Sequence, residues 1–238
     1  MKWSFFLLLF CFTAQAKVVL IDPGHGGEES GAVGYLDARK SRRIYEKDLS
    51  LRLAKKVKDE LSKTSTAYLT RSLDRAVSLQ ERADLADMVK ADLFLSVHFN
   101  SSPNAQGHGF ELYYLDNNSN AATSKVERTE NLNLKGEELI VNQILIDLVV
   151  QQTVTHSKEL ASRVHEKIKP VVKQFKIQDR GIKPGLFYVL ALSKRPGLLV
   201  EAGFVSNPGE LHTINQEKYL GELARAIAAG IQSYLDRK

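Results

Sequence analysis

The sequence contains very little cysteine and no apolar run long enough to cross a membrane. Its 238 residues include one cysteine, Cys11, so neither an intrachain disulfide nor a cluster of thiolate metal ligands is available. A multi-span membrane protein is excluded because a span needs about 20 apolar residues. With 43% hydrophobic and 26% charged residues, the composition also excludes wholesale disorder and favours a domain held together by core packing.

The first sixteen residues have the features of a secretory signal peptide. Lys2 is followed by the apolar residues 5–12 and then by the sequence AQA at 14–16, which is an A-x-A cleavage box. The apolar stretch is too short to span a bilayer about 30 Å thick. We therefore expect cleavage after Ala16, a secreted or periplasmic location, and no stable membrane anchor.

The charge balance favours an anionic polymer as partner. The chain carries 33 Lys and Arg against 28 Asp and Glu, a formal net charge of +5. An exported protein rarely meets nucleic acid, so an acidic polymer of the cell wall is the better match and no nucleic-acid partner is expected.

Apolar runs and amphipathic segments alternate along the chain, which is typical of an α/β fold with helices covering a largely parallel sheet. One connection, between residues 99 and 109, is too short for a helical crossover, so the sheet is expected to be mixed. Strands are expected at residues 17–22, 66–70, 92–99, 109–115, 186–190 and 197–201, and helices at residues 47–63, 78–90, 157–175 and 216–235, with a short helix beginning after Asn207.

A segment of roughly forty residues, about 116–155, does not fit this alternation. It far exceeds the usual connection of about 4–6 residues. Its first half is polar, and its second half contains the apolar stretch LIVNQILIDLVV. A loop of this length is usually a lid, a binding element or a disordered segment, and the apolar half argues against disorder.

Candidate functional residues lie where strands end, which is where functional groups gather in α/β sheets. His25 follows the first expected strand and His98 lies at the end of the third. Glu46 precedes the first long helix, on the same side of the sheet. Because a catalytic zinc takes three imidazole or carboxylate ligands and a water, we expect zinc on His25, Glu46 and His98. Glu201, after the apolar strand LLV, is the candidate catalytic general base.

Each of these residues has a structural interpretation when taken alone. His98 could be a turn or core residue, Glu46 a capping acid favoured by the helix dipole, and Glu201 a buried, paired carboxylate. Spacing by itself does not decide between these interpretations and a zinc site.

Three further charged residues are interpreted structurally. Asp22 is expected to cap its own turn, with support of a ligand histidine as the second interpretation. Arg71 and Arg82 are expected to form salt bridges rather than to bind substrate.

Five segments, in this order, resemble the zinc-dependent N-acetylmuramoyl-L-alanine amidases of the cell wall, the amidase_3 group. They are VVLIDPGHGGEESGAVG, EKDLSLRLAKKVKDEL, LTRSLDRAVSLQERADLAD, ADLFLSVHFNSSPN and LLVEAGFVSNPGE. The resemblance runs from about Lys17 to Tyr234. It implies a single catalytic domain over residues 17–238, a phosphorylase/hydrolase-like three-layer α/β domain with a mixed, mostly parallel sheet flanked by helices. It also implies cleavage of the amide between N-acetylmuramic acid and L-alanine of the peptidoglycan stem peptide.

The resemblance assigns the same four site residues as the strand-end argument. The family's zinc ligands are the histidine of DPGHGG, the glutamate of EKD and the histidine of SVH, which fall on His25, Glu46 and His98. The catalytic glutamate of VEAGF falls on Glu201.

The segment at about 116–155 is similar to the regulatory insert of periplasmic amidases that act in cell separation. In those enzymes a helix covers the active site and a glutamate occupies the open position of the zinc until a LytM-type activator displaces it. The sequence SKVERTENLN matches this helix, so Glu130 is the first candidate for the inhibitory plug and Glu127 the second. The apolar ILIDLVV would form a second helix, with ordinary core packing as the other interpretation.

Two other functions compete with this one. A non-catalytic wall-binding or activator-like module on the same fold would lack a ligand or the base, whereas all four residues are present. A zinc peptidase would cut within the stem peptide, and the family motifs argue against it.

Overall fold

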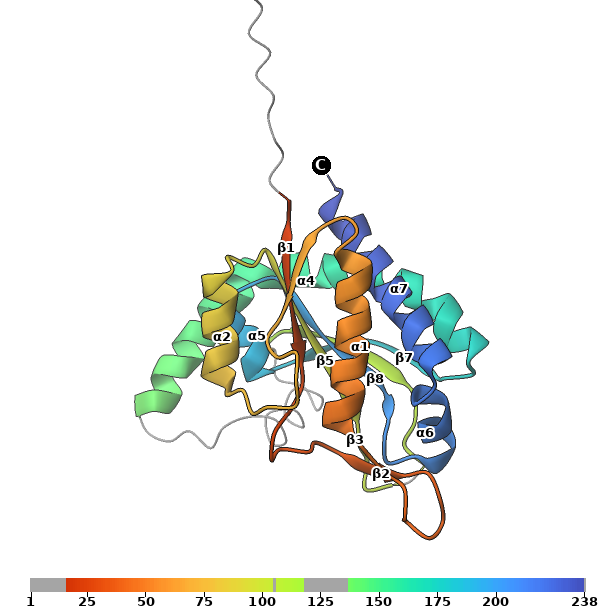
Figure 1. Cartoon of the computed structure of the whole chain (residues 1–238). Helices are drawn as coiled ribbons and strands as arrows, with labels where there is room; N and C mark the ends of the chain where they lie inside the picture. The colour runs from red at the N-terminus through yellow and green to blue at the C-terminus, as the bar shows by residue number, and fades with distance from the viewer. Residues whose placement is uncertain (1–15, 105, 118–136, 238) are drawn as a thin grey trace, which may run out of the picture.

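A six-stranded mixed sheet lies at the centre of the molecule (Figure 1). The structure is a computed structural model that describes residues 16–104, 106–117 and 137–237. The strand order is β4-β1-β5-β8-β6-β7, in which β4, β1, β5 and β8 are parallel, β6 is antiparallel to β8, and β7 is parallel to β6. The strands are β1 (Val18–Pro23), β4 (Thr66–Leu69), β5 (Leu93–Asn100), β6 (Phe110–Leu115), β7 (Asp179–Gly185) and β8 (Gly197–Phe204).

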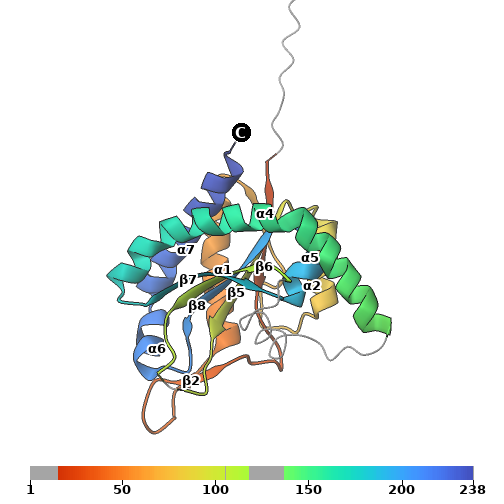
Figure 2. The ribbon, with the colours of Figure 1, turned by 180° about the vertical axis from the view of Figure 1, so that it is seen from behind.

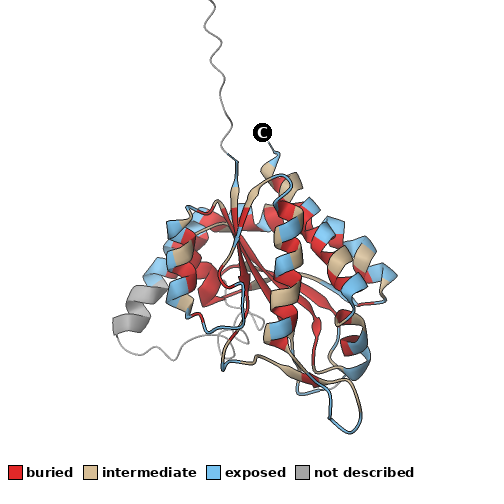
Figure 3. Cartoon of the chain, viewed as in Figure 1, coloured by how far each residue is buried: buried red, intermediate tan, exposed pale blue. Residues whose placement is uncertain are grey.

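Helices cover both faces of the sheet, so the domain has three layers (Figures 1 and 2). One face packs against α1 (Glu46–Leu61), α7 (Glu217–Leu235) and the later part of α4 (Glu137–Gln174). The other face packs against α2 (Leu79–Met88), α5 (Tyr188–Ser193) and the earlier part of α4. Figure 3 shows the buried strands between these layers. The expected three-layer α/β fold with a mixed, mostly parallel sheet is confirmed.

Local sequence patterns explain the two helices nearest the site. In α1, Leu49, Leu53, Val57 and Leu61 recur every four residues and are all buried, as the amphipathic pattern predicts. α2 begins with a capping box, in which the Ser78 hydroxyl accepts from the N–H three residues on and the Glu81 carboxylate accepts from the Ser78 N–H.

The long helix α4 begins earlier than expected. It starts at Glu137, so the apolar stretch expected as a separate helix is its first part. Within that stretch Ile146, Val149 and Val150 are buried among residues of the α2/α5 face, which is ordinary core packing. Pro170 lies inside the helix and does not end it, because the buried residues around it continue the packing onto the other face. Figure 2 shows α4 passing over the sheet from one face to the other.

The prediction of a strand at residues 186–190 is wrong. The strand of this region is β7, which ends just before these residues, and its sequence DRGIKPG contains glycine and proline and has no strand pattern. Proline is tolerated there because β7 is an edge strand. The apolar residues that follow form α5 and pack between the sheet and α2. A small hairpin of β2 (Val33–Tyr35) and β3 (Arg43–Tyr45) was also not expected, and it lies beside α6 (Pro208–Ile214).

Among the described residues, no helix combines the length and the apolar character that a membrane-spanning segment requires. The segment expected to be a signal peptide, 1–16, lies outside the described residues except for Ala16.

Candidate metal centre and active site

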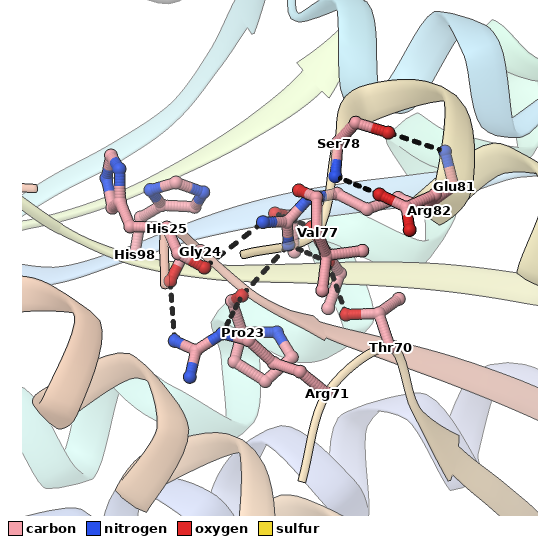
Figure 4. Close-up of polar contacts among 12 residues, drawn as sticks. Pro23, Gly24, His25, Thr70, Arg71, Val77, Ser78, Glu81, Arg82 and His98 are labelled. Atoms are coloured by element: carbon pink, nitrogen blue, oxygen red, sulfur yellow. Dashed lines mark hydrogen bonds and ion pairs between the residues drawn. The ribbon is translucent and has the colours of Figure 1, made fainter. Parts of the chain in front are cut away.

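The three side chains expected to bind zinc lie together at the carboxyl edge of the parallel strands. Oε1 of Glu46 is 3.1 Å from Nε2 of His25 and 3.0 Å from Nδ1 of His98. One donor atom from each of the three lies within 4.8 Å of the other two. The two imidazole rings meet edge to face, with their centroids 5.0 Å apart (Figure 4). A carboxylate oxygen therefore lies between two imidazole nitrogens.

The turn after β1 places His25 opposite His98. His25 has a φ of 58°, in the left-handed region, which turns the chain sharply at the end of the strand. The preceding residue must be glycine, because a Cβ on Gly24 would lie 2.3 Å from Cε1 of the His98 ring. The backbone thus makes room for one ligand while it carries the other.

The start of α1 holds Glu46 in place. Its Oε2 accepts from the N–H of Ala32 at 2.8 Å, and its Oε1 accepts from the N–H of Phe99 at 3.1 Å. Burial alone would raise the pKa of Glu46, but the hydrogen bonds and charges of His25 and His98 hold that pKa well below its usual value. Glu46 is therefore ionised, as a metal ligand must be.

A second carboxylate supports His25 from outside the ligand set. Nδ1 of His25 lies 2.9 Å from Oε1 of Glu29, while its Nε2 faces Glu46. Burial would lower the pKa of His25, but Glu29 and Glu46 together raise it to about 10. The carboxylates thus create a field that stabilises positive charge on the ring, and the same field favours a divalent cation. A carboxylate on the far nitrogen of a ligand histidine is a common feature of zinc sites.

The donor set fits a zinc ion. Ligand atoms about 2.0–2.2 Å from a tetrahedral zinc lie roughly 3.4 Å apart, and the separations of 3.0 and 3.1 Å are close to that value. Two nitrogens and one carboxylate leave a fourth position for water or substrate, which is the arrangement of catalytic zinc.

Glu201 lies on β8, the strand next to the one that carries His98. It is the register partner of His98 in the parallel pair of β5 and β8, so both side chains point to the same face of the sheet. That face is the one covered by α2 and α5. Glu201 is buried and lies within β8, which continues to Phe204 instead of ending at 201 as expected.

Asp22 and Arg82 form a buried ion pair beneath the histidine turn. Asp22 accepts from Arg82 and also from the hydroxyls of Thr70 at 2.6 Å and Ser96 at 3.0 Å. Arg82 donates in addition to the backbone carbonyl of His25 at 3.1 Å. The expected salt bridge of Arg82 is confirmed. Asp22, however, neither caps its own turn nor contacts a ligand ring, because it serves as the counter-ion of Arg82.

Arg71 acts on backbone carbonyls. Its guanidinium is buried and donates to the carbonyls of Gly24 at 2.7 Å, Lys47 at 2.8 Å and Pro23 at 3.1 Å. Figure 4 shows the guanidinium groups of Arg71 and Arg82 directed at the turn that carries His25. Two buried arginines therefore hold this turn in place.

A cavity of about 490 Å³ opens beside the histidines. Its floor includes Asp22, His98 and Leu199 of the sheet, and its walls come from the start of α2 and from residues 187–189. The walls combine apolar and polar side chains, and the cavity gives a substrate group access to the histidines.

Sequence reasoning missed one group at the site. Glu111 of β6 is buried and pairs with Arg180 and Lys183 of β7. It is the register partner of Glu201 in the antiparallel pair of β6 and β8. The only local signal was a charged residue within the apolar strand FELYYL, and nothing local pointed to its partners.

The two residues expected to plug the metal centre, Glu130 and Glu127, lie outside the described residues. Their role therefore stays a prediction.

Comparisons with known proteins agree on one family. The family model for N-acetylmuramoyl-L-alanine amidases matches residues 19–233. The chain is 32% identical over 228 residues to N-acetylmuramoyl-L-alanine amidase AmiA of Escherichia coli strain K12, covering 92% of this chain and 76% of AmiA. The crystal structure of an N-acetylmuramoyl-L-alanine amidase from Clostridium difficile 630 matches with a TM-score of 0.70 at 34% identity, covering 94% of this chain and 100% of that one. The CwlD amidase of Clostridioides difficile, solved in complex with the GerS lipoprotein, matches with a TM-score of 0.68 at 26% identity, covering 92% and 98%.

The chain belongs to the N-acetylmuramoyl-L-alanine amidase family. It is an enzyme, a peptidoglycan hydrolase that cleaves the amide bond between N-acetylmuramic acid and L-alanine. The resemblance to this amidase family is thereby confirmed, and the fold is that of amidase catalytic domains.

Proposed function

We propose that this amidase depends on zinc, that His25, Glu46 and His98 hold the ion, and that Glu201 is the general base. The observation that carries the proposal is the position of the Glu46 carboxylate oxygen between two histidine nitrogens at 3.0 and 3.1 Å. The chemistry of the donors supports it, because nitrogen and oxygen ligands without sulfur suit zinc.

When bound, a zinc ion would polarise the scissile carbonyl and lower the pKa of a water to about 7. Glu201 would handle the proton, and its place on the strand next to His98, facing the same side of the sheet, supports this role. One oxygen of its carboxylate accepts the proton of the attacking water and then donates it to the amide nitrogen of L-alanine. The carbon–nitrogen bond breaks, and the products are a lactyl carboxylic acid on the sugar and a peptide with a free amine.

The first experiment tests zinc dependence and the bond that is cut. Purified protein is incubated with peptidoglycan after chelation and again after zinc is restored, and mass spectrometry identifies the fragments. We expect peptides that begin with L-alanine, loss of activity on chelation and recovery with zinc. Trimmed stem peptides would indicate the competing peptidase, and activity that chelation leaves unchanged would contradict zinc dependence.

Two variants separate metal binding from proton transfer. E46Q should lose both bound zinc and activity, whereas E201Q should keep zinc and lose about 10²–10⁴-fold in kcat. E166Q, at an exposed glutamate of α4, is the matched control and should change neither. Full activity in E201Q would remove Glu201 from the mechanism.

We also propose that the insert at about 116–155 inhibits the resting enzyme, with Glu130 or Glu127 as the plug, until an activator of the LytM type binds. The exposed apolar side chains of Ile144, Leu145 and Leu148, which are 56%, 46% and 49% exposed, support a partner that binds the first part of α4. The complex of the related CwlD amidase with GerS supports a protein partner in general.

The inhibition is tested by shortening the insert without damaging the core. A deletion of residues 119–135 stops well before Ile146, which is buried, so the fold should persist. We expect the basal rate of this variant and of E130A to rise, with E127A as the second candidate and E166A as control. A rate that none of the three changes would contradict inhibition by the insert.

We propose export from the features of the first sixteen residues, with cleavage after Ala16. Amino-terminal sequencing of the mature protein tests this proposal. An amino terminus at Lys17 in protein recovered from outside the cytoplasm supports this location, and an uncleaved chain contradicts it.

A further inference from the structure

Beyond Glu201, the neighbouring strands β6 and β7 carry further charged side chains next to the candidate active site. His98 of β5, Glu201 of β8 and Glu111 of β6 are successive register partners, so they point to the same face of the sheet. The next strand, β7, contributes Arg180 and Lys183. The metal ligands thus lie on one side of Glu201 and two cations lie on the other side.

Glu111 organises these cations and does not fully neutralise them. Its Oε1 accepts from Arg180 and, at 2.6 Å, from Nζ of Lys183, while its Oε2 accepts from Asn100 at 2.9 Å and from the Tyr113 hydroxyl at 2.8 Å. One buried carboxylate therefore faces two cations. Burial would raise the pKa of Glu111, but these partners hold it below its usual value. Glu111, Arg180 and Lys183 taken together therefore carry one positive charge in excess, next to the carboxylate of Glu201.

Both cations reach solvent. The side chains of Arg180 and Lys183 are 36% and 28% exposed, whereas that of Glu111 is 3% exposed. A lysine ammonium carries three N–H donors, and Glu111 takes one of them. Arg180 also donates to the carbonyl of His108 at 3.3 Å, and Nζ of Lys183 lies 6.0 Å from the centre of the Tyr113 ring. These partly exposed cations, held by the register partner of Glu201, suit an anionic group of a bound molecule.

The opposite end of the site has a different character. The cavity beside His25 and His98 has apolar residues in its walls, among them Val77, Leu79 and Phe187, together with polar residues such as Ser78 and Gln80. The substrate also has two different ends. The lactyl carboxyl of the sugar is used in the amide bond, so the carboxylates of the intact substrate lie on its peptide.

We propose that Arg180 and Lys183 bind a carboxylate on the peptide side of the substrate, so that the peptide lies over β6 and β7 and the sugar lies toward the cavity. This assignment rests on the proposed function, because it places the scissile amide between the metal ligands and Glu201. It makes Lys183 and Arg180 determinants of specificity for the residue that follows L-alanine.

The test compares two soluble N-acetylmuramoyl-peptides that differ only in a free carboxylate or a carboxamide on the residue after L-alanine. For the wild-type full chain we expect a KM about 10- to 100-fold lower for the carboxylate, the range for one charge-assisted hydrogen bond. The difference should shrink as salt is added, because the cations are partly exposed.

Variants at Lys183 locate the effect. K183Q should remove most of the preference by raising the KM of the carboxylate substrate, with the carboxamide substrate and kcat little changed, and K183R should retain it. K167Q, at an exposed lysine of α4, is the control. No preference in the wild type, or an equal loss on both substrates in K183Q, overturns the proposal.

A binding measurement separates this inference from the proposed function. Calorimetry with the product peptides, one with the carboxylate and one with the carboxamide, needs no turnover. If the protein binds the two peptides with different affinity but does not hydrolyse peptidoglycan, the inference is supported and the proposed function is contradicted. If the protein hydrolyses peptidoglycan in a zinc-dependent manner but binds both peptides with equal affinity, only the inference is contradicted.

Discussion

Replacing Arg82 with methionine should destabilise the protein mainly through the carboxylate it leaves behind. The side chains of Arg82 and Asp22 are 5% and 1% exposed and form an ion pair beneath the turn that carries His25. Methionine has a similar volume and fills most of the space. The loss is therefore one of charge compensation and hydrogen bonding.

The magnitude follows from the contacts. Besides Asp22, Arg82 donates to the carbonyls of Val77 at 3.1 Å, Pro23 at 3.0 Å and His25 at 3.1 Å. Removing one partner of a buried ion pair costs about 3–5 kcal/mol. Asp22 keeps two hydroxyl donors in R82M, so we expect a loss of about 3–4 kcal/mol in the free energy of unfolding.

A double-mutant cycle with D22N isolates the charge term. The variant D22N/R82M has no buried carboxylate, so it should be more stable than the sum of the single losses predicts, by about 2 kcal/mol. Urea unfolding followed by circular dichroism measures all four proteins, because the single tryptophan, Trp3, lies in the expected signal peptide.

Zinc affinity provides the second measurement. Arg82 holds the backbone carbonyl of His25, so R82M should also weaken zinc binding by about tenfold, as outer partners of metal ligands do. A stability loss below about 1 kcal/mol, or strictly additive single losses, would refute the reasoning, since a buried unpaired charge is its central assumption.

Three further predictions concern the proposed metal ligands and Glu111. G24A should weaken zinc binding at least about tenfold, because its Cβ would lie 2.3 Å from Cε1 of His98, while G221A in α7 leaves zinc binding unchanged because its nearest neighbour is 3.8 Å away. Zinc at about one hundred times its Kd should raise the free energy of unfolding by about 2.7 kcal/mol in thermal and urea unfolding, and E46Q should abolish this gain. The pKa of Glu111 is lowered below its unfolded value of about 4.3, so its contribution to stability is complete above that value and is lost as the pH falls through the folded pKa. The stability difference between wild type and E111Q should therefore shrink from about pH 6 to about pH 3, and a difference that grows over this range would contradict the assignment.

Local patterns predicted most of the secondary structure. The four-residue spacing of α1 and the apolar runs of β1, β5 and β8 depend on neighbours in the chain, so they can be read without the fold. Residues 186–190 show where this fails. An apolar run of this length suits a buried strand or a buried helix equally, and packing between α2 and the sheet selected the helix.

Most of the candidate site could also be inferred from the chain alone. His25 and His98 follow or end strong strands and Glu46 begins a strong helix, and in an α/β sheet such positions converge on one edge. The type of each residue then indicated its chemistry. The strand order was needed to show that Glu201 lies next to His98.

Only the tertiary structure brought Glu111, Arg180 and Lys183 beside Glu201. The two cations lie 69 and 72 residues from Glu111 in the sequence, and β7 had no strand pattern. Strand order and direction are set by packing across the whole sheet, and the reversal of β6 beside β8 is what aligns Glu111 with Glu201. The amino-acid sequence by itself thus determined the fold class and which residues are candidate metal ligands, because both rest on local patterns. The position of Glu111, Arg180 and Lys183 beside Glu201 depended on the pairing of strands far apart in the sequence, which no local pattern predicts.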